Sequence, residues 1–256
     1  MAIALIGGMR KQGFSAAGIQ VVEPFDTARE KIAETFGVRC TAIVDAAALN
    51  CETLVLAVKP QQLREAITPL CGKLGNQLIV SIAAGIRMAD ISRWLGGYSK
   101  LVRTMPNTPA LIGAGVTALC ADSSVDREGR SNAEKVLKAV GSTVWIENEG
   151  QMDAVTAVSG SGPAYVFYFL EAMESAAIGL GFDPQAARRL TVETFLGATR
   201  LAEQSSEPIS VLRERVTSKG GTTEAALLSF AASGISDAIE RGIVAAEARG
   251  RELGDV

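Results

Sequence analysis

The chain has 256 residues, enough for one large domain or two ordinary ones, and its 48% hydrophobic and 21% charged residues are typical of a globular protein. Its formal net charge is −3 with no basic run, and no apolar stretch approaches the roughly 18 residues of a membrane span, which argues against nucleic-acid and membrane partners. Four scattered cysteines without a C-x-x-C pair, and a start that lacks the order of a signal peptide, predict a cytoplasmic protein without disulfides or zinc.

The first 150 residues alternate between short β-rich runs and helical patterns. Strands are expected at 19–23, 53–58, 77–82, 100–104, 115–121 and 143–146. Helices are expected at 26–36, 60–71, 88–95 and 127–140, the first closed by Gly37 and the second opened by Pro60. This alternation predicts an α/β fold, a doubly wound Rossmann-like sheet.

Beyond about residue 150 the β signal disappears. Helical patterns cover 162–181, 184–205, 210–216, 223–233 and 235–253. Asp183 followed by Pro184 is a helix start, an acidic N-cap before proline at the first helical position. We therefore expect a nucleotide-binding domain over 1–150 and an all-α domain over 151–256.

Small and turn-forming residues follow three of the expected strands. These segments are Ala57 to Gln61, Ser81 to Gly85 and Met105 to Pro109. In open α/β sheets ligands bind beyond the carboxyl ends of the strands. Each segment alone would be an ordinary loop, but the three together predict a ligand edge.

Charged residues of both signs follow the strand expected at 19–23. Glu23 or Asp26 could bond the ribose of a dinucleotide, and Arg29 could meet a 2′-phosphate instead. Each could equally be a solvated charge at a helix start. The sequence therefore leaves NADPH and NADH both open.

Two further segments carry hydroxyls beside glycines. Residues 217–223 read Thr-Ser-Lys-Gly-Gly-Thr-Thr and precede a helical pattern, so the free N–H groups of a helix start there favour an anion. Thr222 or Thr223 is expected to be the N-cap, and an ordinary capped helix is the alternative. Residues 159–165 are expected to form a hinge followed by an N-cap, or a close backbone approach with hydroxyls facing a cleft.

The sequence contains no histidine. This excludes Ser-His-Asp and Cys-His catalysis and any histidine-ligated metal, and no metal site is expected. The chemistry must come from hydroxyls, backbone groups, carboxylates, lysine or a cofactor.

Four stretches resemble the pyrroline-5-carboxylate reductase family in their order and spacing. They are 58–61, 103–109, 156–165 and 216–223, and the resemblance runs from Ile19 to the C-terminus. It implies a nucleotide-binding domain joined to a helical dimerisation domain, with the active site near the interface of a homodimer, while assembly beyond a dimer stays open. It also implies hydride transfer from NADPH or NADH to the imine carbon of 1-pyrroline-5-carboxylate, giving L-proline in the last step of proline biosynthesis.

The resemblance assigns roles to individual residues. It implies that the nicotinamide half of the cofactor is lined by Ala57, Val58, Lys59, Pro60, Gln61, Met105, Pro106 and Asn107. It implies that the substrate carboxylate is held by Ser218, Gly221 and Thr222, and that Thr223 bonds the ring nitrogen and is the catalytic residue. Lys219 stands where the family usually has proline, so we expect a less rigid loop with a positive charge near the carboxylate.

The N-terminus departs most from the family, which opens with a strand, a Gly-rich turn and a helix. Met1 to Phe14 aligns with that helix. Alternatively, Ile3 to Ile6 forms the strand and Gly7-Gly8 the turn, but the ten residues Met9 to Gly18 are too few for a crossover. We expect a helix, with the strand and phosphate loop missing, unpaired sheet edges and weak dinucleotide binding. The alternative function is a non-catalytic shortened homologue that keeps the helical dimer but not the cofactor site.

Overall fold

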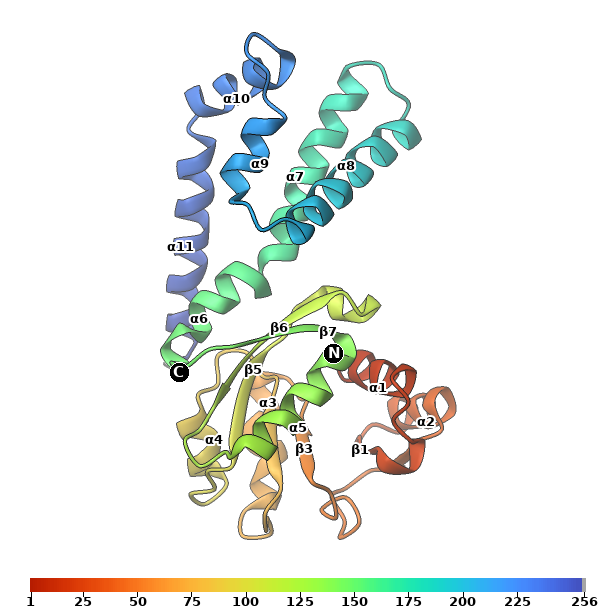
Figure 1. Ribbon diagram of the computed structural model, residues 1–256. Helices are drawn as coiled ribbons and strands as arrows, with labels where there is room; N and C mark the ends of the chain where they lie inside the picture. The colour runs from red at the N-terminus through yellow and green to blue at the C-terminus, as the bar shows by residue number, and fades with distance from the viewer. Residues whose placement is uncertain (255–256) are drawn as a thin grey trace. The chain divides into compact units, whose positions relative to one another are not determined.

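The computed structural model describes residues 1–254, which divide into two compact units. The first unit is Met1–Ser161 together with the end of the chain from Ala246, and it combines sheets and helices. The second is Gly162–Ala245 and contains helices without strands (Figure 1). The predicted succession of an α/β fold and an all-α fold is therefore confirmed.

A five-stranded sheet forms the centre of the first unit. Its strands lie in the order β3 (Thr53–Leu56), β4 (Leu78–Ser81), β5 (Leu101–Met105), β6 (Gly115–Ala121) and β7 (Gly141–Trp145). β3, β4 and β5 are parallel, whereas β6 runs antiparallel to β5. The reason is the short connection from β5 to β6, a 3-10 turn at Thr108–Ile112, because a parallel neighbour would need a crossover of a dozen or more residues.

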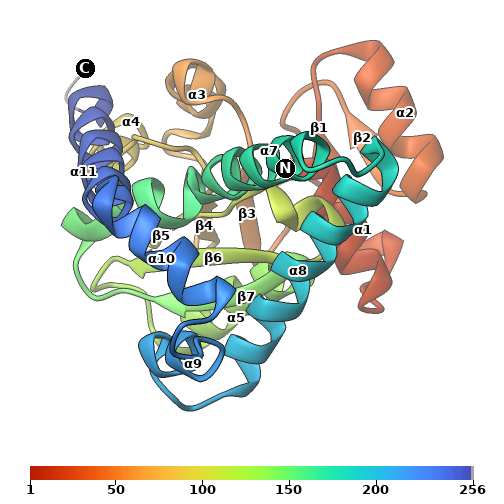
Figure 2. The same ribbon diagram turned by 90° about the horizontal axis from the view of Figure 1, so that it is seen from above.

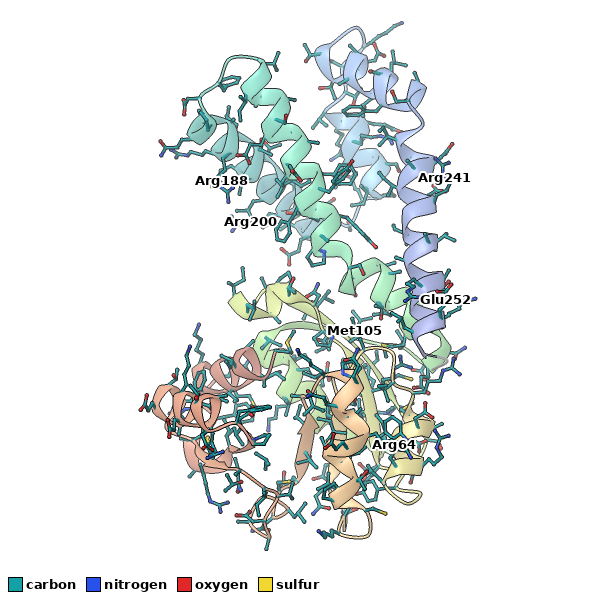
Figure 3. The ribbon with its side chains drawn as sticks, turned by 180° about the vertical axis from the view of Figure 1, so that it is seen from behind. Arg64, Met105, Arg188, Arg200, Arg241 and Glu252 are labelled. Carbon is teal, nitrogen blue, oxygen red and sulfur yellow. The ribbon has the colours of Figure 1, made fainter. Side chains whose placement is uncertain are left out.

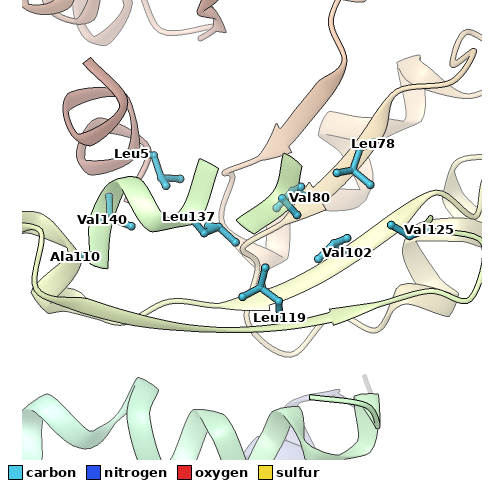
Figure 4. Packing of buried hydrophobic residues seen from close by; sticks show 10 residues of the cluster. Leu5, Leu78, Val80, Val102, Ala110, Leu119, Val125, Leu137 and Val140 are labelled. Carbon is cyan, nitrogen blue, oxygen red and sulfur yellow. The ribbon is translucent and has the colours of Figure 1, made fainter. Parts of the chain in front are cut away.

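Helices cover this sheet on both faces, as the apolar strands predicted. On one face, α3 (Pro60–Ile67) and α4 (Met88–Trp94) pack through Leu63 and Ile91 against Ile79. On the other, α5 (Arg127–Leu137) packs through Leu137 against Val80 (Figure 4). Ile79 and Val80 are neighbours on β4, so their opposite faces follow from the strand's period of two.

The predicted N-terminal helix is confirmed as α1 (Ala2–Lys11), and it is followed by a small second sheet. A 3-10 turn at Ala16–Gly18 leads into β1 (Gln20–Val22), α2 (Asp26–Phe36) and β2 (Arg39–Thr41). β1 and β2 pair with each other in parallel. β2 was not predicted, because a strand of only three residues leaves no periodic pattern.

α1 packs against the cores of both sheets. Leu5 belongs to the core above the five-stranded sheet (Figure 4), and Ile6 belongs to the core of the small sheet. The two sheets therefore lie side by side in this unit, with the β1 strand toward β3, as the views in Figures 1 and 2 show. Among the described residues, β1 pairs only with β2 and β3 only with β4, so each has one unpaired edge.

The chain leaves the first unit through α6 (Met152–Val155) and a π-helical turn at Thr156–Gly160. The second unit then contains α7 (Gly162–Gly179), α8 (Pro184–Gln204), α9 (Ile209–Arg215), α10 (Thr222–Ala232) and most of α11 (Ile235–Gly254). The predicted start of α8 is confirmed, since the Asp183 carboxylate accepts hydrogen bonds from the N–H groups of Gln185 and Ala186. No helix within residues 1–254 has the length and apolar character needed to cross a bilayer.

Candidate functional site

The three segments expected at a ligand edge do meet in the structure. β3, β4 and β5 are parallel neighbours, so their carboxyl ends lie at one edge of the sheet. Ala57 to Gln61 follow β3, Ile82 to Gly85 follow β4, and Met105 to Asn107 close β5. The Thr104 hydroxyl donates to the Ser81 carbonyl at 3.0 Å and ties β5 to β4 near this edge.

The loop after β3 is open to solvent and runs into the start of α3. Ala57, Val58, Lys59 and Gln61 are exposed. Lys59 is the N-cap position of α3 and Pro60 its first helical residue, and no side chain caps the helix. No acidic residue occurs at 57–61, 81–85 or 105–109, so the only charged side chain of these three segments is the Lys59 ammonium. These three segments therefore carry no negative charge that would oppose an anionic ligand.

The turn after β5 is held from within the protein. Pro106 and Asn107 are buried, and the Asn107 Oδ1 atom accepts a hydrogen bond of 3.0 Å from the Val116 N–H. Its Nδ2 atom donates to the Ser159 carbonyl at 3.1 Å. Met105, labelled in Figure 3, packs against Gly160, where an added Cβ would lie only 2.6 Å from the methionine Cε.

The N-cap, one of the two alternatives expected for residues 159–165, is wrong, although the two compact units do divide here, between Ser161 and Gly162. Thr156–Gly160 is a π-helical turn that continues α6, and α7 begins at Gly162 without an intervening loop. The Thr156 and Ser159 hydroxyls donate to the carbonyls four residues earlier, Met152 and Val155, at 2.8 and 3.0 Å. Through these bonds the Thr156 and Ser159 hydroxyls are satisfied within the helical stretch itself.

A buried ion-pair cluster beneath this turn was not predicted. The Arg103 side chain on β5 is 4% exposed, and its Nη1 lies 3.0 Å from Glu149 Oε1. Its Nη2 lies 3.9 Å from Asp153 Oδ1. Glu149 Oε1 also accepts from the Met88 N–H at 2.8 Å, which ties the start of α4 to the helical exit of the unit. The one available signal was an arginine within an otherwise uncharged strand.

The charged groups after β1 are occupied by local partners. The Arg29 guanidinium pairs with Asp26 at 2.5 Å and donates to the Glu23 carbonyl at 3.0 Å. The Glu23 carboxylate accepts from the Phe25 N–H at 3.0 Å. Glu23, Asp26 and Arg29 therefore lie in one compact turn. Their positions fit both interpretations, as ligands of a ribose or phosphate and as charges at a helix start.

Residues 217–221 belong to the loop between α9 and α10 in the second unit, and Thr222 and Thr223 begin α10. Gly220 has a left-handed backbone, with φ of +72°, and its N–H donates to Glu224 Oε2 at 2.6 Å. The Gly221 N–H donates to the Ser218 carbonyl at 3.0 Å, and an added Cβ at Gly221 would lie 2.5 Å from Ser218 Oγ. A side chain at 221 would therefore force the Ser218 hydroxyl to move.

The helix start differs from the prediction in its N-cap. Gly221 is the N-cap and Thr222 the first helical residue, so neither Thr222 nor Thr223 caps α10. The first intrahelical bond runs from the Ala225 N–H to the Gly221 carbonyl. Because Gly221 is the N-cap, the hydroxyls of Thr222 and Thr223 do not cap the helix. Thr222 and Thr223 stand in the first turn of α10, where the N–H groups of a helix start favour an anion.

Two family models match the chain, one in each half. Residues 149–253 match the model for pyrroline-5-carboxylate reductase dimerisation, and residues 1–85 match the model for NADP oxidoreductase, coenzyme F420-dependent. Among curated proteins, a pyrroline-5-carboxylate reductase of Pseudomonas aeruginosa is 44% identical over 256 residues, covering 100% of this chain and 94% of the relative. One of Arabidopsis thaliana is 33% identical over 88% of this chain and 81% of its own.

Solved structures give the same result. A pyrroline-5-carboxylate reductase of Coxiella burnetii superposes with a TM-score of 0.92 at 36% identity, covering 98% of this chain and 94% of the other. A pyrroline carboxylate reductase of Plasmodium falciparum, crystallised with NADP bound, has a TM-score of 0.86 at 25% identity, covering 98% and 93%.

Proposed function

The chain belongs to the pyrroline-5-carboxylate reductase family, and we propose that it reduces 1-pyrroline-5-carboxylate to L-proline by hydride transfer from NADPH or NADH, as the last step of proline biosynthesis. The observation that carries this proposal is the likeness to curated reductases over 99–100% of the chain for the first three relatives. That coverage includes the segments assigned to cofactor and to substrate. It argues against a non-catalytic homologue that keeps only the helical dimer.

The cofactor is assigned to the carboxyl edge of β3 to β5. This assignment covers Ala57, Val58, Lys59, Pro60, Gln61, Met105, Pro106 and Asn107. The exposed loop before α3, the lack of acidic residues along the edge and the Lys59 ammonium support a fit to a dinucleotide. When bound, the nicotinamide supplies the hydride that reduces the imine carbon. The match to an NADP oxidoreductase model supports NADPH as the preferred donor.

The substrate is assigned to the start of α10. The N–H groups of the first turn, with the Ser218 hydroxyl, would hold the substrate carboxylate at Gly221 and Thr222. Thr223 would hydrogen-bond the ring nitrogen through its hydroxyl and act as the catalytic residue. Lys219 is exposed in the same loop and adds a positive charge favourable to an anionic substrate.

This chemistry is compatible with a chain that has no histidine. The imine nitrogen can be protonated in solution before binding, so the hydride adds to a cationic C=N bond and the product is a secondary amine. The residues of the site then have to hold the imine carbon close to the hydride donor and in line with it. This positioning is the main source of rate acceleration in such a transfer.

We also assign the chain to a homodimer and to the cytoplasm. The match of residues 149–253 to a dimerisation model supports the dimer. So does the exposure of large apolar side chains in the second unit, where only Ala187 and Thr191 are buried among the described residues. The cytoplasmic location rests on the sequence features given above.

The direct test is oxidation of NADPH on addition of 1-pyrroline-5-carboxylate. Thr223→Ala should lower kcat/KM by at least about tenfold, since one hydrogen bond to the substrate is lost. Thr217→Ala is the matched control, because the Thr217 hydroxyl of the same loop donates to the Arg213 carbonyl at 2.7 Å. A folded wild-type dimer without activity would refute the function, and an unchanged Thr223→Ala would refute the role of that threonine.

A further inference from the structure

The side chain of Asn107 joins three separate segments of the first unit. It stands in the turn after β5, accepts from the Val116 N–H at the start of β6, and donates to the Ser159 carbonyl in the π-helical turn. The residue is 9% exposed, so these bonds are shielded from water. One amide group therefore connects the turn assigned to the cofactor with the helical exit of the unit.

The sequence explains why the Ser159 carbonyl needs this partner. In α-helical register it would accept from the N–H of residue 163, which is proline and has none. Asn107 supplies a donor from outside the helix. The interaction is local in space, although 52 residues separate the two partners along the chain.

A second contact holds the same two segments together. Gly160 has no side chain, and Met105 fills the space in front of it, with its Cε 2.6 Å from where a Cβ would be. Met105 and Asn107 flank the buried Pro106. The π-helical turn is therefore contacted by the residues on both sides of this proline.

We propose that Asn107 is a positioning residue that fixes the backbone of the turn after β5 to the π-helical turn Thr156–Gly160, and so sets the place of the nicotinamide. The proposal rests on the proposed function, and it gives Asn107 a role through its neighbours and not as a side-chain ligand of the cofactor. Both its carbonyl oxygen and an amide N–H are already used within the protein.

The test separates positioning from simple stabilisation. Asn107→Ala should lower the Tm and lower kcat by about tenfold, with the KM for 1-pyrroline-5-carboxylate changed less than about twofold. Pro163→Ala restores a backbone N–H that can satisfy Ser159 without rebuilding the link to the turn. The double variant should therefore regain part of the lost Tm, since only the Val116 N–H stays unpaired, while kcat stays low. Recovery of kcat together with Tm would overturn the proposal, as would wild-type kcat in Asn107→Ala.

A control variant and a second substitution at Asn107 complete the test. Asn76→Ala removes an exposed asparagine that accepts from Lys100 Nζ at 2.8 Å, and it should leave kcat unchanged. If Asn107→Ala does not fold, Asn107→Asp keeps an acceptor for the Val116 N–H and replaces the donor to Ser159 with a carboxylate oxygen, which repels the Ser159 carbonyl. Amide exchange of residues 105–116, measured without substrate, should rise about tenfold in either variant. Unchanged exchange would overturn the link even if the wild type proved inactive on the imine, an outcome that would refute only the proposed function.

Discussion

The Glu224 carboxylate accepts a hydrogen bond of 2.6 Å from the N–H of Gly220, four residues earlier. Glu224 lies in the first turn of α10, so its charge is stabilised by the helix N-terminus. The bond holds Gly220 in its left-handed conformation and shapes the loop that is assigned to the substrate carboxylate. A substrate carboxylate bound at this helix start would therefore lie near the Glu224 carboxylate and be repelled by its charge.

Two substitutions at Glu224 should act in opposite directions. Glu224→Gln keeps an acceptor for the Gly220 N–H and removes the like charge, so the KM for 1-pyrroline-5-carboxylate should fall about twofold to fivefold. Glu224→Ala removes the bond that orders the loop, so KM should rise by a similar factor. Steady-state kinetics at low salt would measure both. A rise in KM for Glu224→Gln would show that its charge does not oppose the substrate.

The loop before α10 was predictable only in part. Two glycines and flanking hydroxyls predicted an anion-ready helix start, and the structure has Gly220 in a left-handed turn just before α10. The predicted N-cap, Thr222 or Thr223, lies one or two residues after the observed one, Gly221, because glycine can cap a helix without a side chain. The role of Glu224 was missed, since a first-turn acid does not reveal which N–H it meets.

The fold itself was largely predictable where local signals were strong. α2 and β6 have the predicted bounds, since Gly37 ends α2 with a φ of +65° and turn residues flank β6. The orientation of β6 was not predicted, because it depends on how the Thr108–Ile112 connection folds. The Asn107 bond to Ser159 was beyond prediction, since nothing local pairs residues this far apart.

Removing Glu149 should destabilise the first unit. Glu149→Ala leaves the Arg103 guanidinium, whose side chain is 4% exposed, with Asp153 at 3.9 Å as its one ion-pair partner among the described residues. The loss of one partner of a buried charge should cost on the order of 2 kcal/mol, measured by urea unfolding.

Glu207→Ala is the control for this loss. Glu207 pairs with Arg215 at 2.6 Å, but the two side chains are 34% and 64% exposed, so the cost should stay below about 1 kcal/mol. Equal losses in the two variants would show that burial adds nothing to the Arg103 pair.

Asp45 should make the small β1–β2 sheet sensitive to acid. A hydrogen bond from Arg39 on β2 lowers the pKa of the Asp45 carboxyl, as does one from the Ala48 N–H. Gln20 on β1 donates to the same carboxylate at 3.4 Å. Because the folded pKa lies below the unfolded one, this stabilisation is present at neutral pH and is lost as pH falls through the folded pKa.

Asp45→Asn should therefore lower the Tm at pH 7, and the difference from the wild type should shrink as the pH falls below about 4. Thermal unfolding over a pH series would measure it. Asp90→Asn, which breaks an exposed pair with Arg93 within one helical turn, should change the Tm less. A difference that stays constant down to low pH would mean that the carboxylate charge of Asp45 does not stabilise this sheet.

The second unit should assemble through its apolar helices, α7 above all. Val166, Phe167 and Tyr168 are consecutive on α7 and are 44%, 64% and 71% exposed, so they point to different sides of the helix. Residues 162–170 of α7 carry no charged side chain, and a helical stretch that is apolar on every side is stable in water only when other elements cover it. Light scattering should therefore give a mass of twice 26.7 kDa or a multiple of it.

Phe167→Asp should shift the protein toward monomer, while Ser123→Asp, which adds the same charge at an exposed turn of the first unit, should not. A wild-type monomer at micromolar concentration would require these side chains to be covered within one chain.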